Sequence, residues 1–272
     1  MRRLGAALLR MALLAGFVWA VVVGAFVIER RSLIYPLAQD FDAREITAMP
    51  RGRVVEFAGV DGTPVIAWVS PPVDGRPVIL HFTGNAGFTP GAAIRHAPFA
   101  IRGYGLAILN YRGAGGAPGQ PSEAALTADA LALYDALPRL VGPLDGPPVV
   151  QGTSLGAAVA VAVAEQRPAR AIVLNMPFAE LCTVAEHHYP WLPACAVMWD
   201  ERWESIDRAA ALDAPTLVAA AGRDRVIPPE EAERLYRALD VEKRFFLMPE
   251  ADHGGGWGET EAALDWVSRH AG

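Results

Sequence analysis

The protein has 272 residues, and its 24 basic and 30 acidic side chains give a formal charge of −6 at pH 7. A chain with this charge has no overall positive field to attract phosphate groups, which argues against nucleic acid as a partner. Hydrophobic residues make up 52% of the chain, and the stretch that follows residue 31 has the length of one domain. We therefore expect a single folded domain over residues 32–272.

An apolar run lies near the amino terminus. Residues 11–28 read MALLAGFVWAVVVGAFVI and carry no charge. As a helix they would be about 27 Å long, close to the roughly 30 Å hydrocarbon layer of a membrane. We expect residues 1–31 to form a single-pass membrane anchor. Arginines at 2, 3 and 10, with the terminal amine, slightly outnumber those at 30 and 31, which favours a folded domain outside the cytoplasm.

A cleaved secretory signal is the alternative to an anchor. The tripeptide Val23-Gly24-Ala25 offers small residues at which a signal peptidase could cut. The apolar run is longer than usual for a signal and continues beyond that cut to Ile28. Both interpretations export the domain, and sequencing of the mature amino terminus distinguishes them, because a chain that starts near Phe26 would lack the anchor.

From residue 54 onward, short β-rich runs alternate with longer stretches of helical pattern, as in a sheet covered by helices on both faces. Eight strands are expected, at Val54–Phe57, Val65–Val69, Val78–Phe82, Leu106–Asn110, Val149–Gln151, Ala171–Leu174, Thr216–Ala220 and Arg244–Met248. The first two form a predicted hairpin, and helices near 91–102, 122–137, 155–166, 230–239 and 259–269 separate the later ones. Such crossovers imply parallel pairing, so the predicted fold class is α/β with a mostly parallel sheet.

One segment interrupts this alternation. Residues 177–208 lie between two predicted strands and are rich in aromatic residues. We interpret the segment as a small lid inserted into the domain. It also contains both cysteines, Cys182 and Cys195. No CxxC pair or His/Cys cluster offers a zinc ligand set, so no metal is expected, and the cysteines either form one disulfide or remain two buried thiols.

The pattern G-x-S-x-G at Gly152, Ser154 and Gly156 lies between a predicted strand and an alanine-rich helix. Such a turn is so sharp that side chains at the two glycine positions would collide. It lifts the serine hydroxyl to the amino terminus of the helix, where the helix dipole favours developing negative charge. Ser154 is therefore the candidate nucleophile.

A serine nucleophile needs a base and a residue that orients the base. His253 follows the last predicted strand, and Asp224 follows the strand before it, so both loops end at the sheet edge of Ser154. Asp224 could instead pair with a neighbouring arginine or cap its turn, and Asp252 is a weaker candidate because adjacent residues rarely point at each other. The chain order Ser, Asp, His favours His253 as general base and Asp224 as its partner.

Two N–H donors are expected for the oxyanion of an acyl-transfer reaction. The first is the backbone amide of Leu155, which follows the nucleophile. The second should come from the turn after the third strand, TGNAG at 83–87, where we nominate Asn85.

With these pieces in place, the domain resembles the α/β-hydrolase superfamily, and more narrowly its membrane-anchored ABHD-type and Bem-type serine hydrolases, along almost its whole length. The resemblance rests on six stretches: TGNAG at 83–87, NYRGAGGAPGQPSE at 110–123, GTSLG at 152–156, YPWLPACAVMWDERWESI at 189–206, GRDRVIPP at 222–229 and ADHGG at 251–255. Thr83 stands where the group usually has histidine, and Asn110 where it often has aspartate, which affects the expected shape of the oxyanion turn.

The resemblance implies hydrolysis of carboxylic esters or thioesters, often derived from lipids, without metal or organic cofactor. A small-molecule or lipid ester is then the expected substrate, and the membrane is the expected partner of the amino-terminal helix. Two alternatives remain open on the sequence: a serine peptidase of the prolyl-oligopeptidase kind, which shares the order of the triad, and a hydrolase-fold binding module without catalysis.

Overall fold

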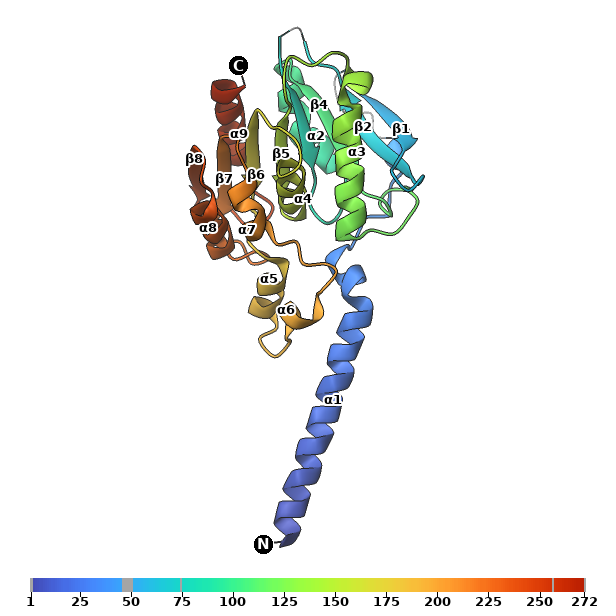
Figure 1. Ribbon diagram of the computed structural model, residues 1–272, viewed down its shortest axis with the longest axis vertical. Coiled ribbons are helices and arrows are strands. Elements are labelled where there is room, and N and C mark those ends of the chain that lie inside the picture. Colours follow the sequence, from blue (N-terminus) through green and yellow to red (C-terminus); the bar gives the residue numbers. More distant parts are fainter. Residues whose placement is uncertain (1, 46–50, 74, 256, 272) are drawn as a thin grey trace.

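The computed structural model describes residues 2–45, 51–73, 75–255 and 257–271. Its centre is an eight-stranded sheet with strand order β1-β2-β4-β3-β5-β6-β7-β8 (Figure 1). The strands are β1 (Arg53–Ala58), β2 (Pro64–Ser70), β3 (Val78–Phe82), β4 (Gly105–Asn110), β5 (Val149–Thr153), β6 (Ala171–Asn175), β7 (Thr216–Ala221) and β8 (Lys243–Met248). β2 pairs antiparallel with β1 and with β4, and the other neighbours pair in parallel. The predicted fold class is confirmed, and each predicted strand lies within two residues of an observed one.

Helices cover both faces of the sheet. Their bounds are α1 (Arg2–Ile34), α2 (Pro90–Ile101), α3 (Glu123–Val141), α4 (Leu155–Ala164), α5 (Leu181–His188), α6 (Ala194–Val197), α7 (Ser205–Arg208), α8 (Pro229–Ala238) and α9 (Trp257–His270). Side chains of α3, α4 and α8 share one apolar cluster with one face of the sheet, and side chains of α2 and α9 share another with the opposite face. The inner strands β3 to β7 are buried along most of their length, because both faces are covered.

α3 extends four residues beyond its predicted end at 137. Pro138 lies inside the helix, which ends at Gly142 with φ 96°. A positive φ of this size suits glycine, which lacks the Cβ that makes the conformation costly for other residues. The end of α3 is therefore set by the glycine, four residues after the proline.

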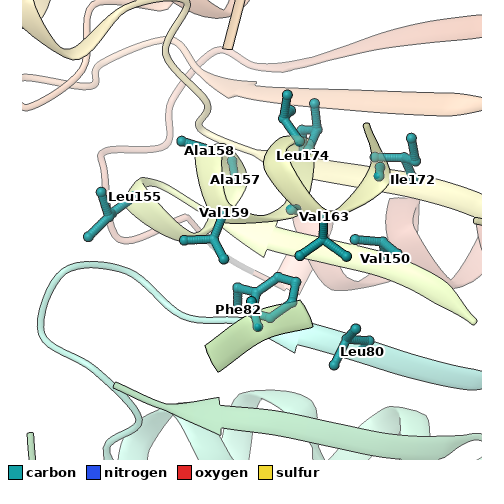
Figure 2. Close-up of a cluster of buried hydrophobic side chains, with 14 of the residues drawn as sticks. Leu80, Phe82, Val150, Leu155, Ala157, Ala158, Val159, Val163, Ile172 and Leu174 are labelled. Carbon is teal, nitrogen blue, oxygen red and sulfur yellow. The ribbon is translucent and has the colours of Figure 1, made fainter. Parts of the chain in front are cut away.

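α4 lies at the centre of the domain, and all of its residues from Leu155 to Ala164 are buried. Figure 2 shows Val159 and Val163 of this helix above Phe82 of β3, with Val150 and Leu174 of the neighbouring strands close by. Glycine, alanine, valine and one leucine make up the helix, and such short side chains let it approach the sheet closely. The residue that precedes α4, Ser154, is thereby fixed to the core.

α1 extends away from the sheet, and only its carboxyl-terminal part lies beside the remainder of the protein (Figure 1). α1 is long and apolar enough to cross a membrane. A signal sequence near an amino terminus can have the same length and composition. The residues predicted as a lid, 177–208, form α5, α6 and α7 between β6 and β7, and we call them the insertion. Cys182 and Cys195 form a disulfide that joins α5 to α6, so the alternative of two free thiols is wrong.

Candidate active site

Ser154 lies on the turn between β5 and α4 with φ 56°, a backbone conformation that is uncommon for any residue except glycine. The turn holds because its neighbours are glycines. A Cβ on Gly152 would lie 2.0 Å from the carbonyl oxygen of Gly156, and a Cβ on Gly156 would lie 2.1 Å from the carbonyl oxygen of Phe82. The amide of Ser154 donates to the carbonyl of Asn175 at 2.8 Å, which ties the turn to the end of β6. The structure thus forms the sharp strand-to-helix turn that the glycine spacing predicts.

The three residues predicted to act together form a chain of hydrogen bonds. His253 Nε2 lies 3.0 Å from Ser154 Oγ, and His253 Nδ1 lies 2.7 Å from Asp224 Oδ2. The carboxylate of Asp224 is 2% exposed and the imidazole of His253 is 25% exposed. A carboxylate that accepts from Nδ1–H leaves a lone pair on Nε2, and this lone pair can accept the proton of the serine hydroxyl.

The topology of the sheet explains why these residues meet. Ser154 follows β5, Asp224 follows β7 and His253 follows β8, and these strands belong to the parallel part of the sheet. Parallel strands place their carboxyl ends at the same edge, and the loops that leave this edge carry the site. Asp224 is held at this edge by two further contacts, because its Oδ1 accepts from the amides of Val226 and Ile227, both at 2.8 Å.

Asp252, the alternative acid, and the histidines other than His253 occupy other places in the fold. Asp252 Oδ1 accepts from the amide of Gly254 at 2.9 Å, so this carboxylate caps its own turn. The rings of His81 and His96 lie against each other inside the domain, with centroids 3.7 Å apart and planes inclined by 47°. His187 and His188 end α5, and His270 ends α9. Of the histidines, it is His253 that contacts the serine.

The turn after β3 lies beside Ser154. An added Cβ on Gly84 would be 3.7 Å from the Cβ of Ser154, and Asn85 lines the same cavity as Ser154 and Leu155. As the first residue of α4, Leu155 has a backbone N–H without a helical acceptor. Both nominated amides therefore belong to segments that border the serine.

Two residues that differ from the pattern of similar proteins make defined contacts, Thr83 through its backbone and Asn110 through its side chain. The carbonyl of Thr83 accepts a hydrogen bond from the hydroxyl of Tyr111 at 2.6 Å, which fixes the start of the turn. Burial raises the pKa of the Tyr111 hydroxyl well above its ordinary value of 10, so this group stays a donor. Asn110 donates from Nδ2 to the carbonyl of Ala114 at 2.9 Å and so orders the glycine-rich loop after β4.

A cavity of about 550 Å³ opens at Ser154. Its walls are mainly apolar and come from α1, from the insertion and from the loop after β7; they include Val22, Ala25, Phe26, Leu33, Phe178, Leu181, Val184, Tyr189, Trp191, Leu192, Met198 and Ile227. A cavity of this size and lining is typical of a site for a small apolar ligand. The contribution of α1 was not predicted, because hydropathy shows that a helix is apolar but not which other segment it contacts.

Glu231 is another residue that no sequence pattern singled out. Its carboxylate accepts from the amides of Ala179 and Glu180, at 3.1 and 3.3 Å, and so holds the segment that carries Phe178 into the cavity. Arg234 bridges Glu231 and Glu180 at 2.6 Å each. No short motif marks this contact, which joins residues about fifty positions apart.

Several known proteins resemble the chain in sequence. No protein-family model matches the chain. An uncharacterized protein of Mycobacterium tuberculosis is 39% identical over 232 residues, which are 83% of this chain and 80% of that protein. Lysophosphatidylserine lipase ABHD12 of Danio rerio is 32% identical over 181 residues, 59% of this chain and 47% of the lipase. Protein bem46 of Schizosaccharomyces pombe is 26% identical over 86% of this chain and 83% of that protein.

Solved structures of esterases share the fold. An acetyl xylan esterase from Paenibacillus superposes with a TM-score of 0.66 at 20% identity, over 86% of this chain and 87% of the esterase. An esterase of Pyrococcus furiosus gives a TM-score of 0.68 at 15% identity, over 87% of this chain and 98% of the esterase. The chain belongs to the α/β-hydrolase superfamily and is related within it to ABHD12 and bem46.

Proposed function

We propose that the protein is a serine hydrolase that cleaves carboxylic esters or thioesters through an acyl-enzyme at Ser154. The observation that carries the proposal is the chain of hydrogen bonds from Ser154 Oγ to His253 and on to the buried Asp224, at 3.0 and 2.7 Å. This arrangement supplies a nucleophile, a base and a group that orients the base. Relationship to a lipase and to esterases supports the same class of reaction.

The reaction follows from these contacts. Ser154 Oγ attacks the carbonyl carbon of the substrate while its proton passes to His253 Nε2, and Asp224 stabilises the imidazolium that forms. The amides of Leu155 and Asn85 donate hydrogen bonds to the carbonyl oxygen and stabilise the negative charge that develops on it. The imidazolium then protonates the alcohol or thiol that leaves. Water, deprotonated by His253, attacks the acyl-enzyme and releases the carboxylic acid and the free serine. Neither a metal nor an organic cofactor takes part.

We further propose that α1 anchors the protein in a membrane with the domain outside the cytoplasm. The length and apolar composition of α1 support an anchor. The disulfide between Cys182 and Cys195 supports an oxidising compartment for the domain. Cleavage after Ala25 would remove Trp19, which contacts the insertion, and Val22, which lines the cavity, so the contacts of α1 also favour retention. Sequencing the amino terminus of the protein isolated from membranes tests this directly.

The hydrolase proposal is tested with p-nitrophenyl esters of increasing acyl length and with a fluorophosphonate probe. The full-length protein should hydrolyse the esters and become labelled at Ser154, and Ser154→Ala should do neither. Hydrolysis that persists in Ser154→Ala would contradict the proposal. A folded protein that the probe does not label would favour a binding module, and cleavage of peptide amides in preference to esters would favour a peptidase.

A further inference from the structure

The insertion exposes a set of aromatic side chains next to α1. Tyr189 and Trp191 are 52% and 50% exposed, their ring centroids lie 6.1 Å apart, and we call these two residues the aromatic edge. Trp199 is also exposed, but its ring lies against the guanidinium of Arg30, with 4.8 Å between the guanidinium carbon and the ring centroid. Among the remaining Phe and Tyr side chains beyond α1, and the Trp side chains there whose exposure the structure describes (Trp68, Trp203 and Trp266), none is exposed. Large apolar side chains gathered in one place on a surface mark a contact with a partner or a membrane.

A hydrogen bond fixes the depth of the aromatic edge along α1. Trp19 Nε1 donates to the carbonyl of Trp191 at 3.0 Å. Trp19 lies eleven residues before Arg30, which corresponds to about 16 Å along a helix. That distance is roughly half of the hydrocarbon layer that an anchor helix must cross. If Arg30 marks the boundary of this layer, Trp191 lies well within it.

Ion pairs hold the insertion to α1. The guanidinium of Arg30 contacts Asp200 at 2.6 Å, and that of Arg31 contacts Glu201 at 2.7 Å. The carboxylate of Glu201 is fully buried and also accepts from the hydroxyl of Tyr35. These contacts neutralise both arginines at the carboxyl end of the helix. They also fix the aromatic edge relative to α1, so the edge lies in the same medium as the part of the helix beside it.

The gap between α1 and the insertion leads to the nucleophile. Val22, Ala25 and Phe26 of α1 face the same cavity as Tyr189, Trp191 and Ser154. The first three belong to the apolar run, between the levels of Trp19 and Arg30. The mouth of the cavity between these two walls therefore lies at the level of the acyl chains.

We propose that the aromatic edge is immersed in the lipid bilayer beside α1, and that the gap between α1 and the insertion admits the acyl chain of a membrane-resident ester to Ser154 directly from the bilayer. The inference rests on the proposed anchor and hydrolase activity, and it names the source of the substrate. A phospholipid bilayer is the partner because α1, which carries one wall of the gap, is itself the segment suited to cross one.

The first experiment measures the depth of the aromatic edge. The chain has two cysteines, and both are in the disulfide, so a new cysteine can be labelled alone without reductant. Tyr189→Cys, Trp191→Cys and, as control, Val60→Cys are labelled with a nitroxide in full-length protein held in nanodiscs of phosphatidylcholine and phosphatidylglycerol. Val60 is 81% exposed on the β1–β2 hairpin. Collisions with oxygen report lipid, and collisions with a water-soluble nickel chelate report water.

Labels at 189 and 191 should collide with oxygen and be shielded from the nickel chelate, whereas the label at 60 should show the reverse. Labels at 189 and 191 that behave like the label at 60 would overturn the proposal. Shielding from both reagents would indicate protein contact, such as a second copy of the chain, and would overturn it too. Because this readout needs no turnover, it stands even if fluorophosphonate labelling shows that the hydrolase proposal itself is wrong.

The second experiment tests entry through the gap. Ala25→Trp narrows the gap from the side of α1, and Val21→Trp is its matched control because Val21 lies on the same helix but does not line the cavity. Ala25→Trp should lower hydrolysis of a long-chain ester embedded in the nanodisc at least about tenfold more than hydrolysis of a water-soluble acetate ester. An unchanged ratio of the two rates in Ala25→Trp would exclude entry from the bilayer.

Discussion

Asp224 holds His253 through one carboxylate oxygen, 2.7 Å from Nδ1, and keeps the other oxygen for the amides of Val226 and Ile227. Asparagine at 224 would retain an oxygen for the two amides but would present an N–H group to the imidazole. The histidine would then hold the wrong tautomer, with its proton on the nitrogen that faces the serine. We expect Asp224→Asn to lower kcat on a p-nitrophenyl ester by about 10³- to 10⁴-fold, measured on protein with an unchanged circular dichroism spectrum.

Asp252→Asn is the matched control for this substitution. Its carboxylate caps the amide of Gly254 and does not contact the imidazole, so kcat should remain near the wild-type value. An equal loss of kcat in the two variants would mean that Asp224 does not act on His253 in the proposed way.

Gly156 tests the requirement for a sharp turn at the nucleophile. A Cβ at this position would lie 2.1 and 2.4 Å from the carbonyl oxygens of Phe82 and Thr83, which are backbone atoms of a buried strand end and cannot move aside. We expect Gly156→Ala to lower the free energy of unfolding by about 3 kcal/mol or more, measured by urea unfolding in detergent with tryptophan fluorescence. Gly91→Ala in α2 should cause no loss, since the nearest atom would be Thr89 Oγ1 at 3.8 Å.

Arg112 forms a buried ion pair that the catalytic proposal does not use. It contacts Asp129 at 2.6 and 2.8 Å and Asp61 at 2.7 Å, and the side chain of Asp129 is even more buried than that of the arginine. Arg112→Met would leave the carboxylate of Asp129 buried without its cation, which costs about 3–5 kcal/mol of unfolding free energy.

Replacing both members of this pair, with Arg112→Met and Asp129→Leu, should recover much of the loss, because no isolated charge then remains. The same urea unfolding measurement compares the variants. A double variant that is no more stable than Arg112→Met would show that the pair stabilises the domain by more than mutual neutralisation.

The buried pair His81 and His96 makes the domain sensitive to acid. Burial lowers the pKa of His96 to about 3 and lowers that of His81 well below its ordinary 6.5. Since the unfolded chain takes up these protons near pH 6.5, the stability that comes from keeping the rings neutral is complete above that pH and is lost as the pH falls towards 3. At about pH 5 each ring should cost about 2 kcal/mol.

We therefore expect the melting temperature in detergent to fall between about pH 7.5 and about pH 5. In His96→Phe this decrease in melting temperature should be roughly half as large as in the wild type. A substitution of His270 serves as the control, because this residue ends α9 and is not part of the pair. Its Nδ1 lies 2.9 Å from the carbonyl of Trp266. A fall that is the same in His96→Phe as in the wild type would assign the acid sensitivity to other groups.

Much of the fold could be predicted from local patterns. The inner strands are continuous apolar runs because both faces of the sheet are covered, and the hairpin at the edge is marked by its glycine turn. Gly152 and Gly156 identify the turn of Ser154, and chain order identifies His253 and Asp224, which the structure brings within hydrogen-bond distance. Their catalytic role stays a prediction until it is measured.

Contacts between distant segments could not be predicted in this way. Arg30 meets Asp200, 170 residues later in the sequence, and Trp19 meets Trp191, 172 residues later. No periodicity or motif encodes such pairs, which depend on how α1 and the insertion lie in space. The state of the two cysteines was open for the same reason, since a disulfide requires a geometry that spacing alone does not specify.

The complete burial of α4 has a consequence for how the protein moves. Its amide hydrogens can reach solvent only when the domain as a whole unfolds, so hydrogen–deuterium exchange there should be as slow as global opening. The insertion, which is joined to the sheet at its two ends and carries short helices, should exchange much faster. Ser154 thus adjoins the part of the molecule that should exchange most slowly, while one wall of its cavity belongs to the insertion, which should exchange faster.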